Sequence, residues 1–440
     1  MANARSSRLA AARLAAAWLA AAFLAPGVAD AHSFQGRVAS AEGRAVVGAM
    51  VTVQSGEPAH ALTVFSGEDG RYETPELVSA PPYLVRVRRI GWRDLRLEGQ
   101  PAPVGPLDLV LERETDPAAV AAQLPASRWY ALALERIDDD AEREELKRQC
   151  TFCHQQGSWA TRRVREPEEW HKVLALMGRM GGMVGRDLRE SIPELFNEAY
   201  APEHAVPILT AGLGQPGFAP PPPPEVRRAV VEEWELGGRA SMQHDVVYHP
   251  GEGRLYSVDM AQDRLYELDP SAPDGARRSF RIPDDGVPLG GAFRSKSRPD
   301  TPSSNSHVGP HSIQVAPDGR LWITLANGNR LAGFDVHTEQ WQIHRLDDGY
   351  YPHTLRFDAR GRIWFTIAAS NHVGMFDPAT GESHEVRLPA PTWGQDLTMR
   401  LLPLFLWVGR HVDIRDLAAN TEEATTMPVP YGIDVGADGA

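Results

Sequence analysis

Cysteine is nearly absent from this chain of 440 residues, which has only two, Cys150 and Cys153. A disulfide framework that replaces a hydrophobic core needs several cysteine pairs, so that class of small extracellular domain is excluded. Basic residues are outnumbered as well, with 45 Lys and Arg against 58 Asp and Glu and a formal net charge of −13. Nucleic-acid binding depends on basic stripes that neutralise phosphates, so we expect no nucleic-acid partner.

Long hydrophobic runs are also missing. The run LAAAWLAAAFLA near the N-terminus has about a dozen residues, whereas about 20 are needed to cross a bilayer. Arg5, Arg8 and Arg13 precede or enter it, and residues 29–31 (ADA) offer a small-x-small cleavage site. This pattern predicts a secretory signal peptide at residues 1–31, with an uncleaved membrane anchor as the alternative. We expect no stable membrane span in the mature chain. Alanine-rich, arginine-rich and lysine-poor usage is typical of high-GC bacteria, so the predicted location is the periplasm.

Turn-forming residues are abundant, with 39 Gly and 36 Pro, which favours β architecture over helical bundles. The length exceeds that of one ordinary domain. We predict a multidomain chain with a β-sandwich at residues 33–114, a small α-helical domain at 117–218, a Pro-rich linker at 219–235 and a β-propeller at 236–440. The five consecutive prolines at 220–224 predict a stiff, extended spacer.

Residues 33–112 contain short apolar stretches separated by turns such as AEGRAV and GEDGRY. A strand spacing near ten residues with Asp-Gly turns indicates a sandwich. The segment GRVASAEGRAVVGAMVTVQSG, followed by GEDGRYETPEL and YLVRVRRIGW, resembles the carboxypeptidase regulatory-like domain, a prealbumin-like sandwich. That resemblance implies a scaffold or docking module and no peptidase activity.

Both cysteines lie in CTFCH, residues 150–154. A zinc site would need further ligands, and the sequence has no third cysteine and no nearby histidine pair. Disulfide-exchange chemistry would need a βαβ pattern around the motif, and a structural disulfide would close a very short loop. Covalent haem attachment uses two such cysteines and an adjacent histidine as the proximal iron ligand. Haem attachment therefore explains Cys150, Cys153 and His154 together.

The flanking sequence has helical periodicity. A helix is predicted to run into Cys150, and another contains Trp170, Val173, Leu174 and Met177 at the spacing of one helix face. The segment resembles a small mono-haem cytochrome c domain through CTFCH, TRR, EEW and the methionine cluster. The resemblance implies one covalent haem c and electron transfer, with Trp170 against the haem. Met177 is the first candidate for the distal iron ligand, and the alternatives are Met180, Met183 and His171. Arg162 and Arg163 are candidates for pairing with haem propionates or are simply exposed arginines.

The C-terminal half contains repeats. They begin at His244, His311, His353 and Tyr431, and each reads as strand, Asp-Gly-type turn and strand. The step from His311 to His353 equals one four-stranded propeller blade. The longer step to Tyr431 predicts either two shortened blades or one blade with an insertion. The whole region has room for about four or five blades.

Residues 317–324 (PDGRLWIT) and 361–375 resemble the streptogramin (virginiamycin B) lyase type of propeller. In that family, His and Glu residues around a divalent metal carry out the lyase reaction. His311 and His353 stand where a family histidine could lie, but Leu325 and Ile367 occupy the positions expected for glutamate. The inner strands of a propeller converge on a central channel. We therefore expect these histidines, with His244 and His307, at one entrance of that channel. There they would form a metal site, a site for a small-molecule substrate, or a structural feature of the repeat.

The last repeat stops within its first turn at Ala440. This predicts either a strand that completes the first blade or an incomplete propeller. The primary functional prediction is a periplasmic haem protein that transfers electrons to or from a redox partner protein. The alternatives are a metal-dependent propeller lyase or hydrolase with an accessory haem, and a non-catalytic scaffold. The sequence identifies no catalytic residue.

Overall fold

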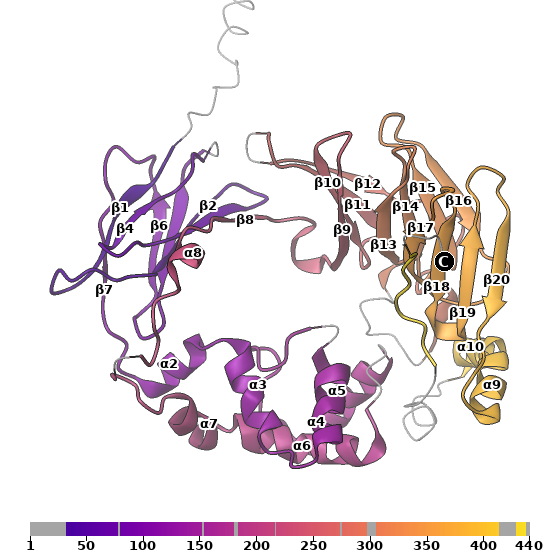
Figure 1. The fold of residues 1–440 in the computed structure, drawn as a ribbon, viewed down its shortest axis with the longest axis horizontal. Coiled ribbons are helices and arrows are strands. Elements are labelled where there is room, and N and C mark those ends of the chain that lie inside the picture. Colours follow the sequence, from indigo (N-terminus) through magenta and orange to yellow (C-terminus); the bar gives the residue numbers. More distant parts are fainter. Residues whose placement is uncertain are drawn as a thin grey trace, which may run out of the picture. The chain divides into compact units, whose positions relative to one another are not determined.

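The computed structural model describes residues 32–77, 80–151, 154–179, 184–215, 217–272, 275–296, 305–412 and 428–436. The predicted signal peptide, Cys153, Met180 and Met183 lie outside them. The chain divides into two compact units, each described here by itself (Figure 1). The first contains residues up to Val87, Leu95–Val110 and Pro223–Glu233, and the second contains Arg88–Asp94, Leu111–Pro222 and the residues from Trp234 onward.

The first unit is built from two sheets. One has the strand order β4-β1-β7 and the other β6-β5-β2-β3-β8. The strands are β1 (Gln35–Ser40), β2 (Met50–Ser55), β3 (His60–Phe65), β4 (Arg71–Glu73), β5 (Tyr83–Arg88), β6 (Leu95–Gln100), β7 (Leu109–Leu111) and β8 (Val231–Trp234). Burial alternates along β2 and β5, as expected for strands with one face on a core. The predicted β-rich module is therefore confirmed as a two-sheet structure, and six of its strands were expected.

The sandwich prediction missed β6 and β8. Residues 219–235 were predicted as a linker, but the end of that segment forms the short helix α8 (Pro224–Arg227) and then β8. β8 is the edge strand beside β3, and Glu232 accepts a hydrogen bond from the buried His60 ring at 2.8 Å. The linker prediction is thus wrong for residues 224–234, because strand pairing with a distant segment leaves no local sequence signal.

Residues 117–209 form helices. These are α2 (Pro117–Gln123), α3 (Ala126–Leu134), α4 (Asp140–Thr151), α5 (Pro167–Arg179), α6 (Arg186–Tyr200) and α7 (Pro202–Leu209). Their shared core is rich in aromatic residues and includes Trp129, Tyr130, Trp170, Phe196 and Tyr200. The predicted helix into Cys150 and the predicted Trp170–Met177 helix are both confirmed. Trp170 is buried, and Val173 and Leu174 pack against the same core.

The C-terminal region contains three four-stranded antiparallel sheets in succession, which stand side by side in Figure 1. The first has β9 (Gln243–His249), β10 (Arg254–Asp259), β11 (Arg264–Asp269) and β12 (Ala276–Arg281). The second has β13 (Pro310–Val315), β14 (Leu321–Leu325), β15 (Arg330–Phe334) and β16 (Trp341–Arg345). The third has β17 (Pro352–Phe357), β18 (Ile363–Ile367), β19 (His372–Phe376) and β20 (Ser383–Arg387). Each sheet pairs its strands in chain order, which is the blade pattern of a propeller.

The predicted four or five blades are corrected to three within the described residues. After β20 the chain forms α9 (Trp393–Arg400) and α10 (Leu402–His411) instead of strands. The long step from His353 to Tyr431 is therefore one blade followed by a helical insertion. Repeat spacing alone could not separate this arrangement from two shortened blades. Within the described residues, no helix is long and apolar enough to cross a membrane.

Candidate functional site

The CTFCH segment begins at the C-terminal end of α4. Cys150 lies in the last turn of that helix and packs against the helical core. Burial, assisted by the Glu145 carboxylate, raises the pKa of the Cys150 thiol to about 11. A thiol that is protonated at neutral pH is a poor nucleophile. The environment of Cys150 therefore disfavours disulfide-exchange chemistry, one of the alternatives left open by the sequence.

His154 lies at the surface beside this helix end. Its Nδ1 is 3.3 Å from the Gln155 carbonyl oxygen. Because a carbonyl only accepts hydrogen bonds, Nδ1 is the donor in this contact, which does not use Nε2. A backbone carbonyl on one ring nitrogen is a common arrangement for histidines that bind a metal through the other nitrogen.

The loop after His154 is tied back onto the helices. Gln156 donates a hydrogen bond of 2.7 Å to the Cys150 carbonyl oxygen, one of the acceptors left open at a helix end. Gly157 has φ +76°, and a Cβ at this position would lie 2.2 Å from the Ala126 carbonyl oxygen. Only glycine fits this close approach to α3. The loop after His154 is thus tied to α4 and packed closely against α3.

Two buried tyrosines flank Cys150. Among the described residues, the hydroxyl groups of Tyr130 and Tyr200 have no hydrogen-bond partner. Burial raises the pKa of both phenols, with Cys150 as the next contribution in each case. Buried hydroxyl groups normally find a partner, since an unpaired one costs about 1–3 kcal/mol. A polar group bound next to Cys150 could therefore be stabilised by hydrogen bonds from these two hydroxyl groups.

Arg162 lies near the same tyrosines. Its guanidinium stacks on Trp129 at 4.3 Å from the ring centroid and donates to the Ala122 carbonyl oxygen at 3.1 Å. Burial lowers the pKa of Arg162, and the interaction with Tyr200 opposes that shift. Arg163, the other candidate for pairing with a propionate, is exposed and lies over Trp159. Of the two arginines, Arg162 is the one that interacts with the helical core, through Trp129 and Tyr200.

The α5 helix supplies the remaining candidates. Trp170 is a core residue whose indole N–H donates to Asn197 Oδ1 at 2.9 Å. Met177 lies seven residues further along the helix and is half-buried. His171 is exposed on this helix, and its Nδ1 donates to the Pro167 carbonyl oxygen at 2.7 Å. Met177 thus has the spacing of the same α5 face as Trp170, whereas His171 is exposed.

These residues fit a covalently bound haem. Cys150 packs against the helical core, His154 follows it with Nδ1 on a backbone carbonyl, and near that cysteine lie two buried hydroxyl groups without a hydrogen-bond partner among the described residues. Such a mixture of apolar walls and a few polar groups matches a porphyrin with an apolar body and a charged edge. The sequence singled out neither Tyr130 nor Tyr200. Their burial depends on the packing of α3 against α6, which no local pattern reveals.

The propeller histidines form a second cluster. His244, His311 and His353 come from β9, β13 and β17, the first strands of the three blades, and these strands neighbour one another. The His311 ring lies 3.7 Å from His244 and 4.0 Å from His353 between centroids, and His353 lies 4.0 Å from Tyr431. The repeat alignment is thus confirmed, since it brings its four starting residues into one column of rings. His307 is differently engaged, with Nδ1 donating to the Val287 carbonyl oxygen at 2.7 Å.

A repeated hydrogen bond explains this column. The hydroxyl of Thr324 on β14 donates to the His353 carbonyl oxygen at 2.7 Å. The equivalent Thr366 on β18 contacts the Tyr431 carbonyl oxygen at 3.1 Å. The second and third blades therefore each hold the first residue of the next repeat through a threonine. Tyr431 is bound to the third blade in the same way as His353 is bound to the second blade.

The histidine column is neutral at pH 7. Burial and then His353 and His244 hold the pKa of His311 well below its usual range. Burial, followed by His244, lowers the pKa of His353 to about 4. The described residues contain no group of three or more His, Cys, Asp or Glu side chains that could hold a metal ion. The geometry therefore gives no support to a divalent metal at His311 and His353, which stays a prediction.

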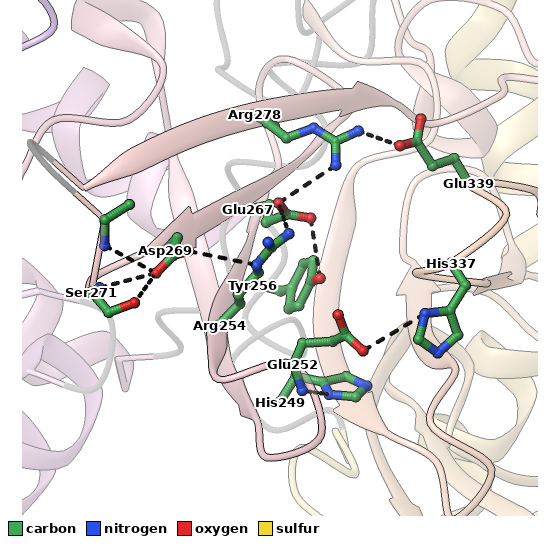
Figure 2. Close-up of polar contacts among 11 residues, drawn as sticks. His249, Glu252, Arg254, Tyr256, Glu267, Asp269, Ser271, Arg278, His337 and Glu339 are labelled. Atoms are coloured by element: carbon green, nitrogen blue, oxygen red, sulfur yellow. Dashed lines mark hydrogen bonds and ion pairs between the residues drawn. The ribbon is translucent and has the colours of Figure 1, made fainter.

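A third polar cluster joins the first two blades (Figure 2). The buried Glu267 accepts from Arg254 at 2.7 Å and from the Tyr256 hydroxyl at 3.1 Å. Arg278 lies 3.6 Å from the same carboxylate and also pairs with Glu339 of the second blade. Because these charges are paired within the protein, the cluster fastens one blade to the next and is not a binding site. The sequence analysis did not find it.

Comparison with known proteins gives only distant likenesses. No protein-family model and no curated protein matches the chain. Among solved structures, virginiamycin B lyase from Staphylococcus aureus is 18% identical, covers 37% of this chain and 46% of its own, and has a TM-score of 0.29. Hydrazine synthase from Kuenenia stuttgartiensis is 12% identical, with 36% and 40% covered and a TM-score of 0.26.

A protein from Lactobacillus plantarum is 17% identical, with 34% and 44% covered and a TM-score of 0.27. The chain thus spans less than half the length of each of these structures. They are propeller-like neighbours. The assignment of three blades here rests on this chain's own strand order.

Proposed function

We propose that this chain is an exported c-type haem protein that transfers electrons, with the haem held by residues 117–218. The observation that supports this most strongly is the surroundings of the CTFCH motif. Cys150 is half-buried at the end of α4 and packs against the helical core, and Nδ1 of the nearby His154 contacts the Gln155 carbonyl oxygen, a contact that does not use Nε2. A haem c bound there would supply reversible one-electron chemistry.

The chain's own residues would divide the work of holding that group. Cys150 and Cys153 would form the two thioether bonds, and His154 would be the proximal ligand. Met177 is the first candidate for the distal side, because it is half-buried and lies two helical turns after Trp170 on α5. Met180 and Met183 are the alternatives. Arg162, with the Tyr130 and Tyr200 hydroxyl groups, would stabilise the polar edge of the haem.

The other parts would serve the haem domain. We infer that the first unit is a carboxypeptidase regulatory-like scaffold, on the resemblance of its sequence and on its two-sheet structure. The blades would provide a partner- or substrate-binding module from which electrons pass to or from the haem. Export through residues 1–31 would deliver the chain to the periplasm, the compartment in which bacteria attach c-type haem.

The test is a redox titration of the full chain produced with its own leader in a bacterium that matures c-type cytochromes. We expect one reversible one-electron transition in the visible spectrum. The transition should be lost in the Cys150→Ser, Cys153→Ser double variant. Met177→Leu should keep the covalent haem and lower the midpoint potential, because a thioether ligand raises it. A chain that folds but shows no redox transition would refute the proposal.

A further inference from the structure

The helical insertion after the third blade exposes an unusual number of large apolar side chains. In α9, α10 and the residues beside them, these are Trp393, Leu397, Leu401, Leu404, Phe405, Trp407 and Val412. Trp393 is 79% exposed and Trp407 58%. Within the two helices only Met399 and Gly409 are buried. We call this set the helical apolar patch; patches of this kind mark interaction sites more often than chance exposure does.

The patch is held in place by polar contacts. The Lys296 backbone N–H and the Ser295 hydroxyl both donate to the Gly409 carbonyl oxygen, at 2.9 Å and 3.0 Å. Arg410 in turn donates to the Ala292 carbonyl oxygen at 3.2 Å. At the other end, Thr392 and Gln395 form a capping box that starts α9. The helices are therefore formed and anchored while their apolar side chains stay on the surface.

The charge around the patch is opposite to that of the chain. The exposed cationic or titratable basic residues next to it are Arg294, Lys296, Arg400, Arg410 and His411. Asp396 is the only acidic residue between Trp393 and Val412, and it pairs with Arg400 at 2.7 Å. The whole chain carries −13. An anionic surface would thus be attracted at this patch and repelled by the protein as a whole.

We propose that α9, α10 and residues 294–296 bind the surface of an anionic phospholipid bilayer. The two helices have 8 and 10 residues, far fewer than the about 20 that span a membrane. Exposed Trp, Phe and Leu beside Arg and Lys are typical of helices that lie in the interface plane. Tryptophan is enriched at the headgroup level, and nearby cations add attraction to anionic lipid. This surface would hold the protein against a membrane without crossing it.

The test is flotation of the full chain with vesicles of phosphatidylglycerol and phosphatidylcholine, compared with vesicles of phosphatidylcholine alone. We expect the protein to float with the anionic vesicles at low salt and to be released as the salt concentration rises. The Leu404→Glu, Phe405→Glu double variant should bind at least about tenfold more weakly. Lys296→Glu should weaken binding about fivefold or more. The control is Val386→Glu on β20, which replaces another exposed apolar residue and should bind like the parent.

Absence of flotation with anionic vesicles would overturn the proposal, and so would equal binding to both kinds of vesicle. If the parent chain does not bind vesicles but forms a dimer, and the double variant is monomeric, then the helical apolar patch binds a second copy of the chain instead. If the double variant fails to fold, the lipid and salt dependence of the parent chain still decide. The inference does not depend on haem binding. We therefore expect the Cys150→Ser, Cys153→Ser variant to float with anionic vesicles like the parent.

Discussion

Gly157 shows how strongly one residue can be constrained beside the proposed haem ligand. Its φ is +76°, and an added Cβ would meet the Ala126 carbonyl oxygen and the Tyr130 backbone nitrogen. The Gly157→Ala substitution should therefore lower the free energy of unfolding of the helical region by about 3 kcal/mol or more. Hydrogen exchange of the α3 amides measures the loss.

Gly212→Ala is the matched control in the same region, with φ +83° and nothing within 4 Å of the added Cβ. Here only the backbone conformation is penalised, by about 1 kcal/mol. Equal losses in the two variants would show that the loop can move away from α3. In that case His154 would not be rigidly positioned.

His353 makes the propeller sensitive to acid. Its pKa is about 4 in the folded chain, against about 6.5 when exposed in the unfolded chain. Above pH 6.5 both states are neutral at this site. As the pH falls from 6.5 to 4 the unfolded state takes up the proton first, so stability should fall by about 2–3 kcal/mol. Amide exchange of β17 at several pH values measures this loss.

The His353→Gln substitution should flatten that pH dependence, with the remaining slope due to the neighbouring His311 and His244, whose pKa values are also lowered. His384→Gln, at an exposed position on β20, should leave the slope unchanged. A pH profile that is the same for the parent and His353→Gln would contradict the burial of this ring in the column.

At the scale of elements, β8 is a segment distant in sequence that pairs with β3 at the edge of the first unit's larger sheet. The Glu232→Ala substitution removes the 2.8 Å contact with the buried His60 ring and should cost about 1 kcal/mol, since the carboxylate is partly exposed. Glu233→Ala, at an exposed position on the same strand, is the control. Amide exchange of β3 should increase only in the first variant. An unchanged exchange rate would mean that β8 does not depend on this contact.

The elements that the sequence predicted are those with a strong local period. The spacing of Trp170, Val173, Leu174 and Met177 was sufficient for α5, and the Asp-Gly-type turns were sufficient for the blades. β8 and β6 were missed because an edge strand is defined by its partner. The helices α9 and α10 were missed because their apolar residues are exposed and repeat spacing alone suggested strands.

The residues of the candidate site likewise fall into those that the sequence predicted and those that it missed. Cys150, Cys153 and His154 were found because they are adjacent in sequence. Tyr130, Tyr200 and Gly157 were not found, because only the packing of α3, α6 and the loop brings them to Cys150. The histidine column was predicted by position within the repeats. The divalent metal proposed for it has no group of ligands among the described residues.

At the scale of the whole molecule, the chain has three kinds of part. The first unit is a two-sheet structure completed by β8, the helical region surrounds Cys150, and three blades carry the histidine column and the helical apolar patch. A redox centre on a chain that binds membranes would meet partners confined to the plane of the bilayer. Haem attachment is the claim on which this function rests.

The most direct test is the mass of the intact full chain, produced with its leader in a bacterium that matures c-type cytochromes. The account predicts a mass equal to the chain without residues 1–31 plus one haem that survives denaturation. The Cys150→Ser, Cys153→Ser variant should lack that addition. A folded, exported chain with both cysteines and no added haem would contradict the central claim.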